Sequence, residues 1–196
     1  MISPYLFRRT CAVTLLITFV VACGRGEITL PETSTASQLT VDASATWAYV
    51  DLATGATTVQ TDAATSPSWD IGFNATSIVL NGGTNGPAGI LGNCLCQNAS
   101  ATNDQILTMT PANQADAFAS VSSTSIPTAS ANWSNDVFAT NKWYKYNLAG
   151  DNRISPTFNV YLIRRGATVY KLQLINYYGP AGETRRITFR YDRVTP

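Results

Sequence analysis

The last part of the chain, from residue 158 onward, alternates apolar and polar side chains, and this pattern constrains the fold more than any other feature. Tyr170, Leu172 and Leu174 point to one side of an extended chain, whereas Lys171 and Gln173 point to the other. This period of two is typical of a β-strand. Three such segments follow one another across short turns: 158–165, 168–178 and 186–192. We predict an antiparallel meander with one face buried and the other exposed to solvent.

Shorter strand signals precede the meander. Aromatic and β-branched residues predict strands at 47–52, 57–60, 69–73, 78–80, 106–109 and 143–147. Thr110 and Pro111 are typical of a helix N-terminus, and Ala112–Val121 is the one convincing helical segment. The sequence therefore predicts an all-β fold, mainly antiparallel sheet, with one short helix.

The N-terminus carries an export signal. Arg8 and Arg9 precede an apolar run, and residues 20–23 (Val-Val-Ala-Cys) resemble the bacterial lipobox, in which cleavage exposes a lipid-modified cysteine. We expect a lipoprotein signal peptide at 1–22, lipidation of Cys23, a flexible tether at 23–45 and a single β domain at 46–196. The protein would then be anchored in the membrane of a bacterial cell envelope, at the outer membrane.

Composition excludes several functions. The chain has no histidine, which excludes His-dependent nucleophiles and the common catalytic zinc sites. Asp70, inside an apolar strand, is either a hydrogen-bonded structural carboxylate or a catalytic acid. Ten of the 13 Lys and Arg residues lie from Lys142 onward, either on the solvent face of strands or at an anion site. Nothing favours nucleic acid, and we expect a protein that is not an enzyme.

A glycine-rich segment follows the strand at 78–80. It is a candidate pocket loop, because glycine permits positive φ and close approach to a ligand. The alternative is an ordinary surface loop, and no regular element is expected between 81 and 103. The candidate loop residues are Asn81, Gly82, Gly83, Thr84, Asn85 and Gly86.

Three sulfur atoms are candidate ligands for haem iron or another metal. Cys94 and Cys96 could form a disulfide, bind a metal as thiolates, or remain free. Met109, the sole methionine after the signal peptide, could be a soft ligand or could fill the core.

Several segments together resemble the HmuY family of bacterial haem-binding surface lipoproteins. The similarity runs from Trp47 to Tyr191, and the residues that carry it are 69–73 (Trp-Asp-Ile-Gly-Phe), 81–86, 143–146 and the final meander. The resemblance implies an all-β fold with a haem pocket built partly by loops and hairpins. The best-known members hold the iron between two histidines, which this chain lacks. Some members are thought to use methionine, and Met109 is the candidate here.

Two functional hypotheses follow. The first is a lipid-anchored, non-catalytic binding protein that sequesters haem or another porphyrin without two histidines. Trp133, Trp143 and Tyr144 would cover the ring, and arginines would pair with its propionates. The second is a surface interaction module that binds a protein or a glycan, in which Cys94 and Cys96 form a structural clamp and no haem is bound.

Overall fold

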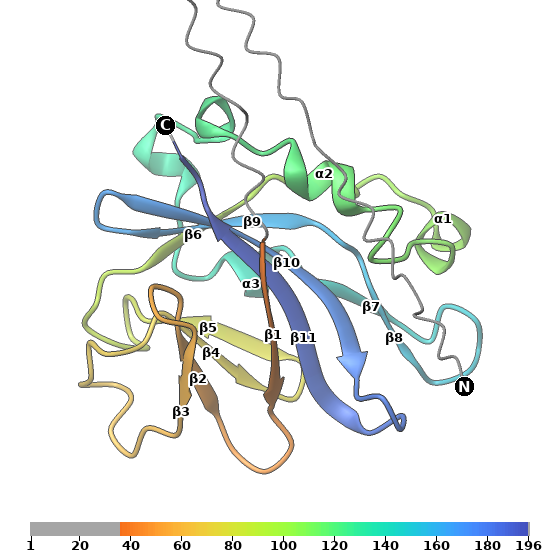
Figure 1. Cartoon of the computed structure of the whole chain (residues 1–196), viewed down its shortest axis with the longest axis horizontal. Coiled ribbons are helices and arrows are strands. Elements are labelled where there is room, and N and C mark those ends of the chain that lie inside the picture. Colours follow the sequence, from red (N-terminus) through yellow and green to blue (C-terminus); the bar gives the residue numbers. More distant parts are fainter. Residues whose placement is uncertain (1–35, 196) are drawn as a thin grey trace, which may run out of the picture. The chain divides into compact units, whose positions relative to one another are not determined.

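The computed structural model describes residues 36–195, which belong to the compact unit Ser34–Pro196. Its main feature is a five-stranded antiparallel sheet of order β1-β11-β10-β9-β6 (Figure 1). The bounds are β1 Ser37–Asp42, β6 Leu91–Cys94, β9 Val160–Arg165, β10 Thr168–Tyr178 and β11 Thr184–Arg193.

A second antiparallel sheet has the order β3-β2-β4-β5, and β7 and β8 form a separate hairpin. The bounds are β2 Ala48–Asp51, β3 Ala56–Thr58, β4 Ile71–Asn74, β5 Ser77–Leu80, β7 Tyr144–Tyr146 and β8 Ile154–Pro156. Within residues 36–195, three short α-helices and two 3-10 helices complete the fold: α1 Asn103–Leu107, α2 Ala115–Ala119, η1 Ser123–Ser125, η2 Ser130–Asn132 and α3 Val137–Thr140. The all-β prediction is confirmed.

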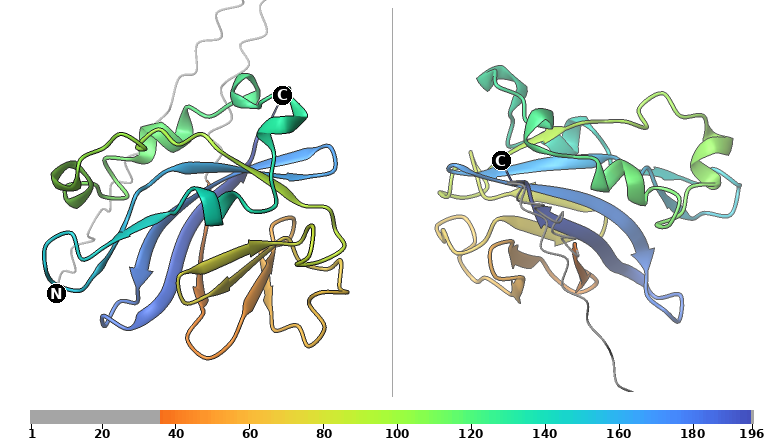
Figure 2. Two further views of the ribbon diagram at one scale, coloured as in Figure 1. Left: turned by 180° about the vertical axis from the view of Figure 1, so that it is seen from behind. Right: turned by 45° about the horizontal axis from the view of Figure 1, so that its top comes forward.

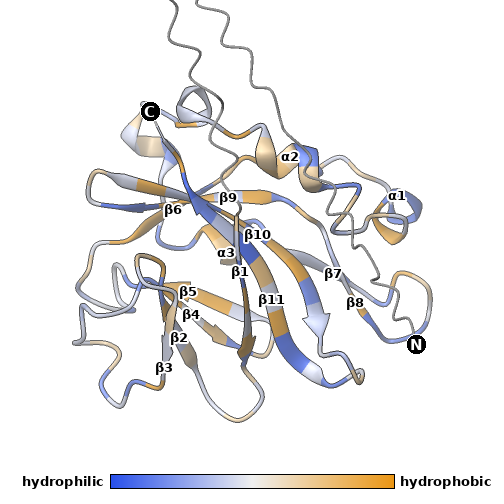
Figure 3. Ribbon diagram, in the orientation of Figure 1, coloured by the Kyte–Doolittle hydropathy of each residue, from blue (hydrophilic) through white to orange (hydrophobic). Residues whose placement is uncertain are grey.

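The predicted meander is confirmed in β9, β10 and β11, where Leu172 pairs with Tyr161 on one side and with Tyr191 on the other. Its buried face packs on the second sheet, and the rings of Phe73 and Phe189 stack there at 5.2 Å between centroids. Two sheets that pack face to face in this way bury alternate residues of every strand. In Figure 3, β11 is hydrophobic in its middle and hydrophilic at both ends.

The expectation that the other face of the meander is exposed to solvent is wrong. Helix α2 and the loops around it cover this face, so that the five-stranded sheet lies between α2 and the second sheet (Figure 2). Gln173 is 0% and Lys171 8% exposed. Lys171 Nζ donates to the carbonyl of Val121 (3.1 Å), and Arg190 Nη2 donates to that of Gln114 (2.7 Å). Carbonyl groups therefore replace water around these cations.

The helical predictions need correction. Residues 106–109 are not a strand: α1 covers the first two of them, and a capping box between Thr102 and Gln105 fixes its start. The predicted helix at 112–121 is shorter, since α2 spans five residues, of which Phe118 is buried. Helix α3 was not predicted.

Two strands lie in segments that were predicted to lack regular structure. Strand β6 falls inside the expected loop at 81–103. Strand β1 falls inside the expected tether at 23–45, which is wrong for Ser37–Asp42 because these residues pair with β11. Thr40 and Thr188 side chains hydrogen-bond across that pair at 2.8 Å. None of the helices between residues 36 and 195 is long and apolar enough to cross a membrane.

Candidate functional site

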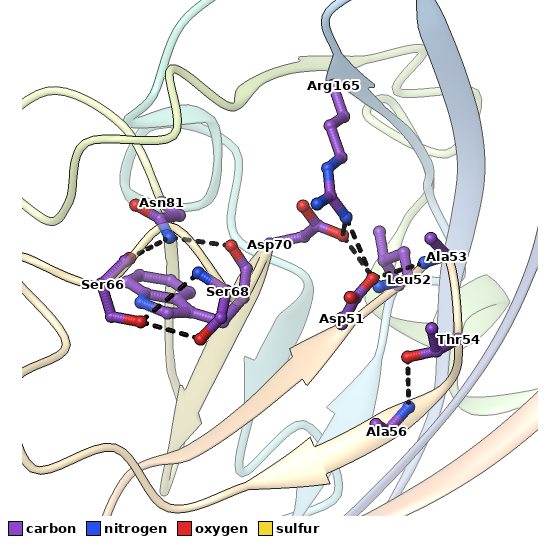
Figure 4. Close-up of polar contacts among 11 residues, drawn as sticks. Asp51, Leu52, Ala53, Thr54, Ala56, Ser66, Ser68, Asp70, Asn81 and Arg165 are labelled. Atoms are coloured by element: carbon purple, nitrogen blue, oxygen red, sulfur yellow. Dashed lines mark hydrogen bonds and ion pairs between the residues drawn. The ribbon is translucent and has the colours of Figure 1, made fainter.

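The glycine loop packs against the body of the domain. Asn81 is fully buried, and its Nδ2 donates to the carbonyl of Ser66 at 2.9 Å (Figure 4) and to that of Trp69 at 2.8 Å. Its Oδ1 accepts the amide N–H of Ala88 at 3.1 Å. A buried amide with three partners ties the start of the loop to the segment before β4 and to Ala88.

The glycines of this loop are required by close packing. A Cβ on Gly82 would lie 2.4 Å from the carbonyl oxygen of Ile90, and one on Gly86 would lie 2.0 Å from Asn81 Oδ1. The neighbour that the glycines approach is therefore the protein itself. Residues 81–86 line none of the clefts described below.

Cys94 and Cys96 form a disulfide with their Cα atoms 5.0 Å apart. Cys94 ends β6 beside Tyr161, and Cys96 Sγ lies 3.5 Å from Asn141 Oδ1. Disulfide sulfurs are not the thiolate ligands that a metal prefers. Among the described residues, no group of three or more His, Cys, Asp or Glu side chains could hold a metal ion.

Asp70 is the buried member of a charge cluster that also contains Asp51 and Arg165, which are partly exposed. Its Oδ2 accepts the amide N–H of Leu52 at 2.8 Å, and Arg165 Nη1 lies 3.3 Å from the same oxygen and 3.0 Å from Asp51 Oδ1 (Figure 4). Burial raises the pKa of Asp70, although the Leu52 amide and Arg165 act in the opposite direction. Arg165 ends β9, so the cluster joins the two sheets and has the geometry of a structural carboxylate.

Met109 lies on a cleft of about 290 Å³ between three parts of the chain. One wall is α1 and the residues after it, the second is β8, and the third is the end of β10. Apolar side chains predominate. The lining residues are Ile106, Leu107, Met109, Thr110, Pro111, Arg153, Ile154, Ser155, Pro156, Phe158, Ile175, Asn176 and Tyr178.

Local contacts fix the cleft walls. Buried Ile106 anchors α1. The Tyr178 hydroxyl accepts the amide N–H of Ile154 at 2.9 Å and so ties β8 to β10. The guanidinium carbon of Arg153 lies 4.4 Å from the centroid of the Tyr178 ring, within range of a cation–π contact. The cleft therefore has one cation beside an aromatic side chain and one thioether.

Two further clefts share residues with this one. A polar cleft of about 460 Å³ includes Met109 and is lined otherwise by amides, hydroxyls and an alanine. A cleft of about 370 Å³ shares Pro111, Ile175, Asn176 and Tyr178. Met109 and Tyr178 thus each line two clefts, and the space around them is larger than the 290 Å³ cleft alone.

The tryptophans expected to cover a ligand lie elsewhere. Trp143 is buried in the core, and its Nε1 donates to the carbonyl of Thr76 at 3.0 Å. Trp133 is also buried, with Arg164 4.4 Å from its ring centroid. Of Met109, Arg153 and Tyr178, which line the Met109 cleft, Met109 was a candidate from the sequence, whereas Tyr178 and Arg153 were not singled out. The one signal for Tyr178 was its place at the end of a strand, beside the Gly-Pro turn.

These features define an all-β binding protein with a cleft beside the β7–β8 hairpin. Residues 43–191 match the family model described as HmuY protein. The chain therefore belongs to the HmuY family, as its resemblance predicted. Comparison with curated protein sequences gave no match.

Solved structures share the fold. A candidate lipoprotein of Bacteroides fragilis is 17% identical with a TM-score of 0.50, and the alignment covers 84% of this chain and 92% of that one. The apo HmuY analogue of Tannerella forsythia is 13% identical with a TM-score of 0.51, covering 82% and 96%. Apo PinO from Porphyromonas gingivitis has the same identity and TM-score, covering 83% and 99%.

Proposed function

We propose that the protein is a lipid-anchored, non-catalytic binding protein that sequesters haem or a related porphyrin in the Met109 cleft without two histidines. The observation that carries this proposal is the placement of Met109 in a cleft with apolar walls and one arginine. Family membership supports it, since the relative from Tannerella forsythia is named an HmuY analogue.

The donor set of the cleft fits such a ligand. Leu107, Met109 and Ile154 are at least partly exposed and offer apolar surface to a macrocycle, and binding sites of this kind are mostly apolar with a few placed polar groups. Arg153 offers a guanidinium, which pairs well with carboxylates such as the propionates. The Met109 thioether is a known type of haem ligand, and bound haem would supply the iron that it ligates.

The lipid anchor is part of the same proposal. Cys23 lies outside the described residues, and the lipobox sequence before it supports cleavage at 22 and attachment of acyl chains. The anchor would hold the domain at the bacterial cell envelope, at the outer membrane. Mass spectrometry of protein from the membrane fraction tests it: a Cys23→Ser variant should lose the lipid mass and leave that fraction.

A haem titration tests binding. Ferric and ferrous haem added to the purified mature chain should each shift the Soret band, with saturation at one haem per chain. Met109→Leu should weaken ferrous haem binding at least tenfold. Val59→Leu is the control, because Val59 is 70% exposed and is not a lining residue. No shift in either oxidation state would refute the proposal.

A second candidate function is recognition of a glycan or a protein without haem. The specific observation in its favour is the 460 Å³ cleft, whose amide and hydroxyl groups suit hydrogen bonding to a neutral polar ligand. The Cys94–Cys96 disulfide would be the structural clamp that this hypothesis expects. Binding on a glycan array, together with no Soret shift, would favour this function.

A further inference from the structure

Tyr178 combines three features that no other residue of the cleft has. It ends β10 and lines both the Met109 cleft of 290 Å³ and the 370 Å³ cleft. Its hydroxyl oxygen accepts the N–H of Ile154 at 2.9 Å. Its ring lies beside the guanidinium of Arg153 at 4.4 Å. The phenol is therefore held in place at a cleft wall with a donor on its oxygen and a cation at its ring.

Among the side chains that line the Met109 cleft, Tyr178 alone can become an anionic oxygen ligand. The lining set contains no Asp, Glu or Cys, and its other oxygen donors are neutral hydroxyl and amide groups. Tyrosine phenolate is an established type of haem ligand.

We infer that Tyr178 is the protein ligand for the ferric iron of a bound porphyrin; this inference rests on the function proposed above. Ligation replaces the phenol proton with iron and releases that proton to solvent, without electron transfer. Phenolate is a hard ligand suited to ferric iron, whereas the Met109 thioether is soft. The cleft thus offers a different ligand for each oxidation state of the iron.

The two ligands predict opposite effects of two substitutions. Tyr178→Phe should lower the affinity for ferric haem at least tenfold, remove the phenolate-to-iron charge-transfer band, and change the affinity for ferrous haem less than threefold. Met109→Leu should lower the affinity for ferrous haem at least tenfold, change the affinity for ferric haem less than threefold, and leave the charge-transfer band in place. Iron-free protoporphyrin IX reports the contribution of ring contacts, and its affinity should change little in both variants.

Tyr146→Phe is the matched control. Tyr146 lies on the β7–β8 hairpin, is 58% exposed, and donates its hydroxyl to Asn152 Oδ1 rather than lining the cleft. It should leave all three affinities unchanged. Thermal unfolding of each variant without ligand checks that the hairpin still docks. Should Tyr178→Phe fail to fold, Tyr178→His provides the second test, because an imidazole ligand should convert the ferric spectrum to a nitrogen-ligated type.

The outcomes separate this inference from the proposed function. Unchanged ferric affinity and spectrum in Tyr178→Phe would overturn the inference and leave haem binding intact. An equal loss for ferric haem, ferrous haem and protoporphyrin would also overturn it, since it would show that the hydroxyl only holds the β7–β8 hairpin. No haem binding by the unaltered protein would refute the proposed function itself. A selective ferric loss with loss of the band would support the inference.

Discussion

Asp70 allows a sharp test of the energetics of this fold. Its carboxylate is fully buried, and Oδ1 has no hydrogen-bond partner in the structure. Asp70→Ala leaves the Leu52 N–H unpaired, which costs about 1–3 kcal/mol, and removes a partner of Arg165. Loss of one member of a buried ion pair costs about 3–5 kcal/mol. Arg165 is partly exposed and keeps Asp51, so we expect the lower end, about 3 kcal/mol.

Asp70→Asn should cost less than Asp70→Ala, because an amide oxygen can still accept the Leu52 N–H. Its pH dependence is the stronger test. Burial raises the folded-state pKa of Asp70 above the unfolded value of about 3.9. Between these two pKa values the folded state binds more protons, so the contribution of Asp70 to the free energy of unfolding falls as pH rises. The cost of Asp70→Asn should therefore be largest below the unfolded pKa and smaller above the folded one.

Urea unfolding followed by tryptophan fluorescence, repeated across the acidic range, measures these costs. Asp62→Asn is the control, since Asp62 is exposed in a neighbouring loop. For a domain of this size, about 3 kcal/mol corresponds to a fall in Tm of roughly 6–12 °C. If the cost of Asp70→Asn instead grows with rising pH, the pairing with Arg165 outweighs burial, and the claim that burial dominates the pKa of Asp70 is refuted.

Three other substitutions test the loop, the disulfide and the covered sheet face. Gly82→Ala should destabilise the fold by about 1–3 kcal/mol in the same denaturation assay, because its Cβ meets the Ile90 carbonyl. Gly89→Ala is a comparison without a steric clash, since nothing lies within 4 Å of its Cβ, and it measures the separate cost of a positive φ. Replacing both Cys94 and Cys96 with Ser should lower the free energy of unfolding by less than about 2 kcal/mol, since a disulfide that closes so short a loop restrains the unfolded chain little. A larger decrease, measured by urea unfolding, would show that the disulfide also shapes β6. Lys171→Glu should destabilise strongly, because it sets an anion against the Val121 carbonyl, whereas Lys145→Glu, on an exposed residue, should change Tm by about 2 °C or less.

The alternation in β10 shows what local sequence can predict. Leu172 and Leu174 face the core between the sheets, as their period of two requires. The same pattern could not show that Lys171 and Gln173 are buried as well, because their burial depends on a helix that lies far away in the sequence and covers them. The prediction of a strand at residues 106–109 was wrong for a related reason. Their apolar character suits a strand, but the Thr102–Gln105 capping box starts a helix there.

For the candidate site, too, some properties follow from the sequence and others depend on tertiary structure. The absence of histidine and the presence of a single mature methionine are properties of the sequence, and they limit the possible iron ligands whatever fold the chain adopts. The sequence also determined the meander, since backbone geometry makes side chains alternate along a strand. Only tertiary structure placed Met109, Arg153 and Tyr178 around one cleft and joined the Asn81 side chain to the carbonyls of Ser66 and Trp69. Such contacts join distant segments, and local preference carries no information about which segments will meet.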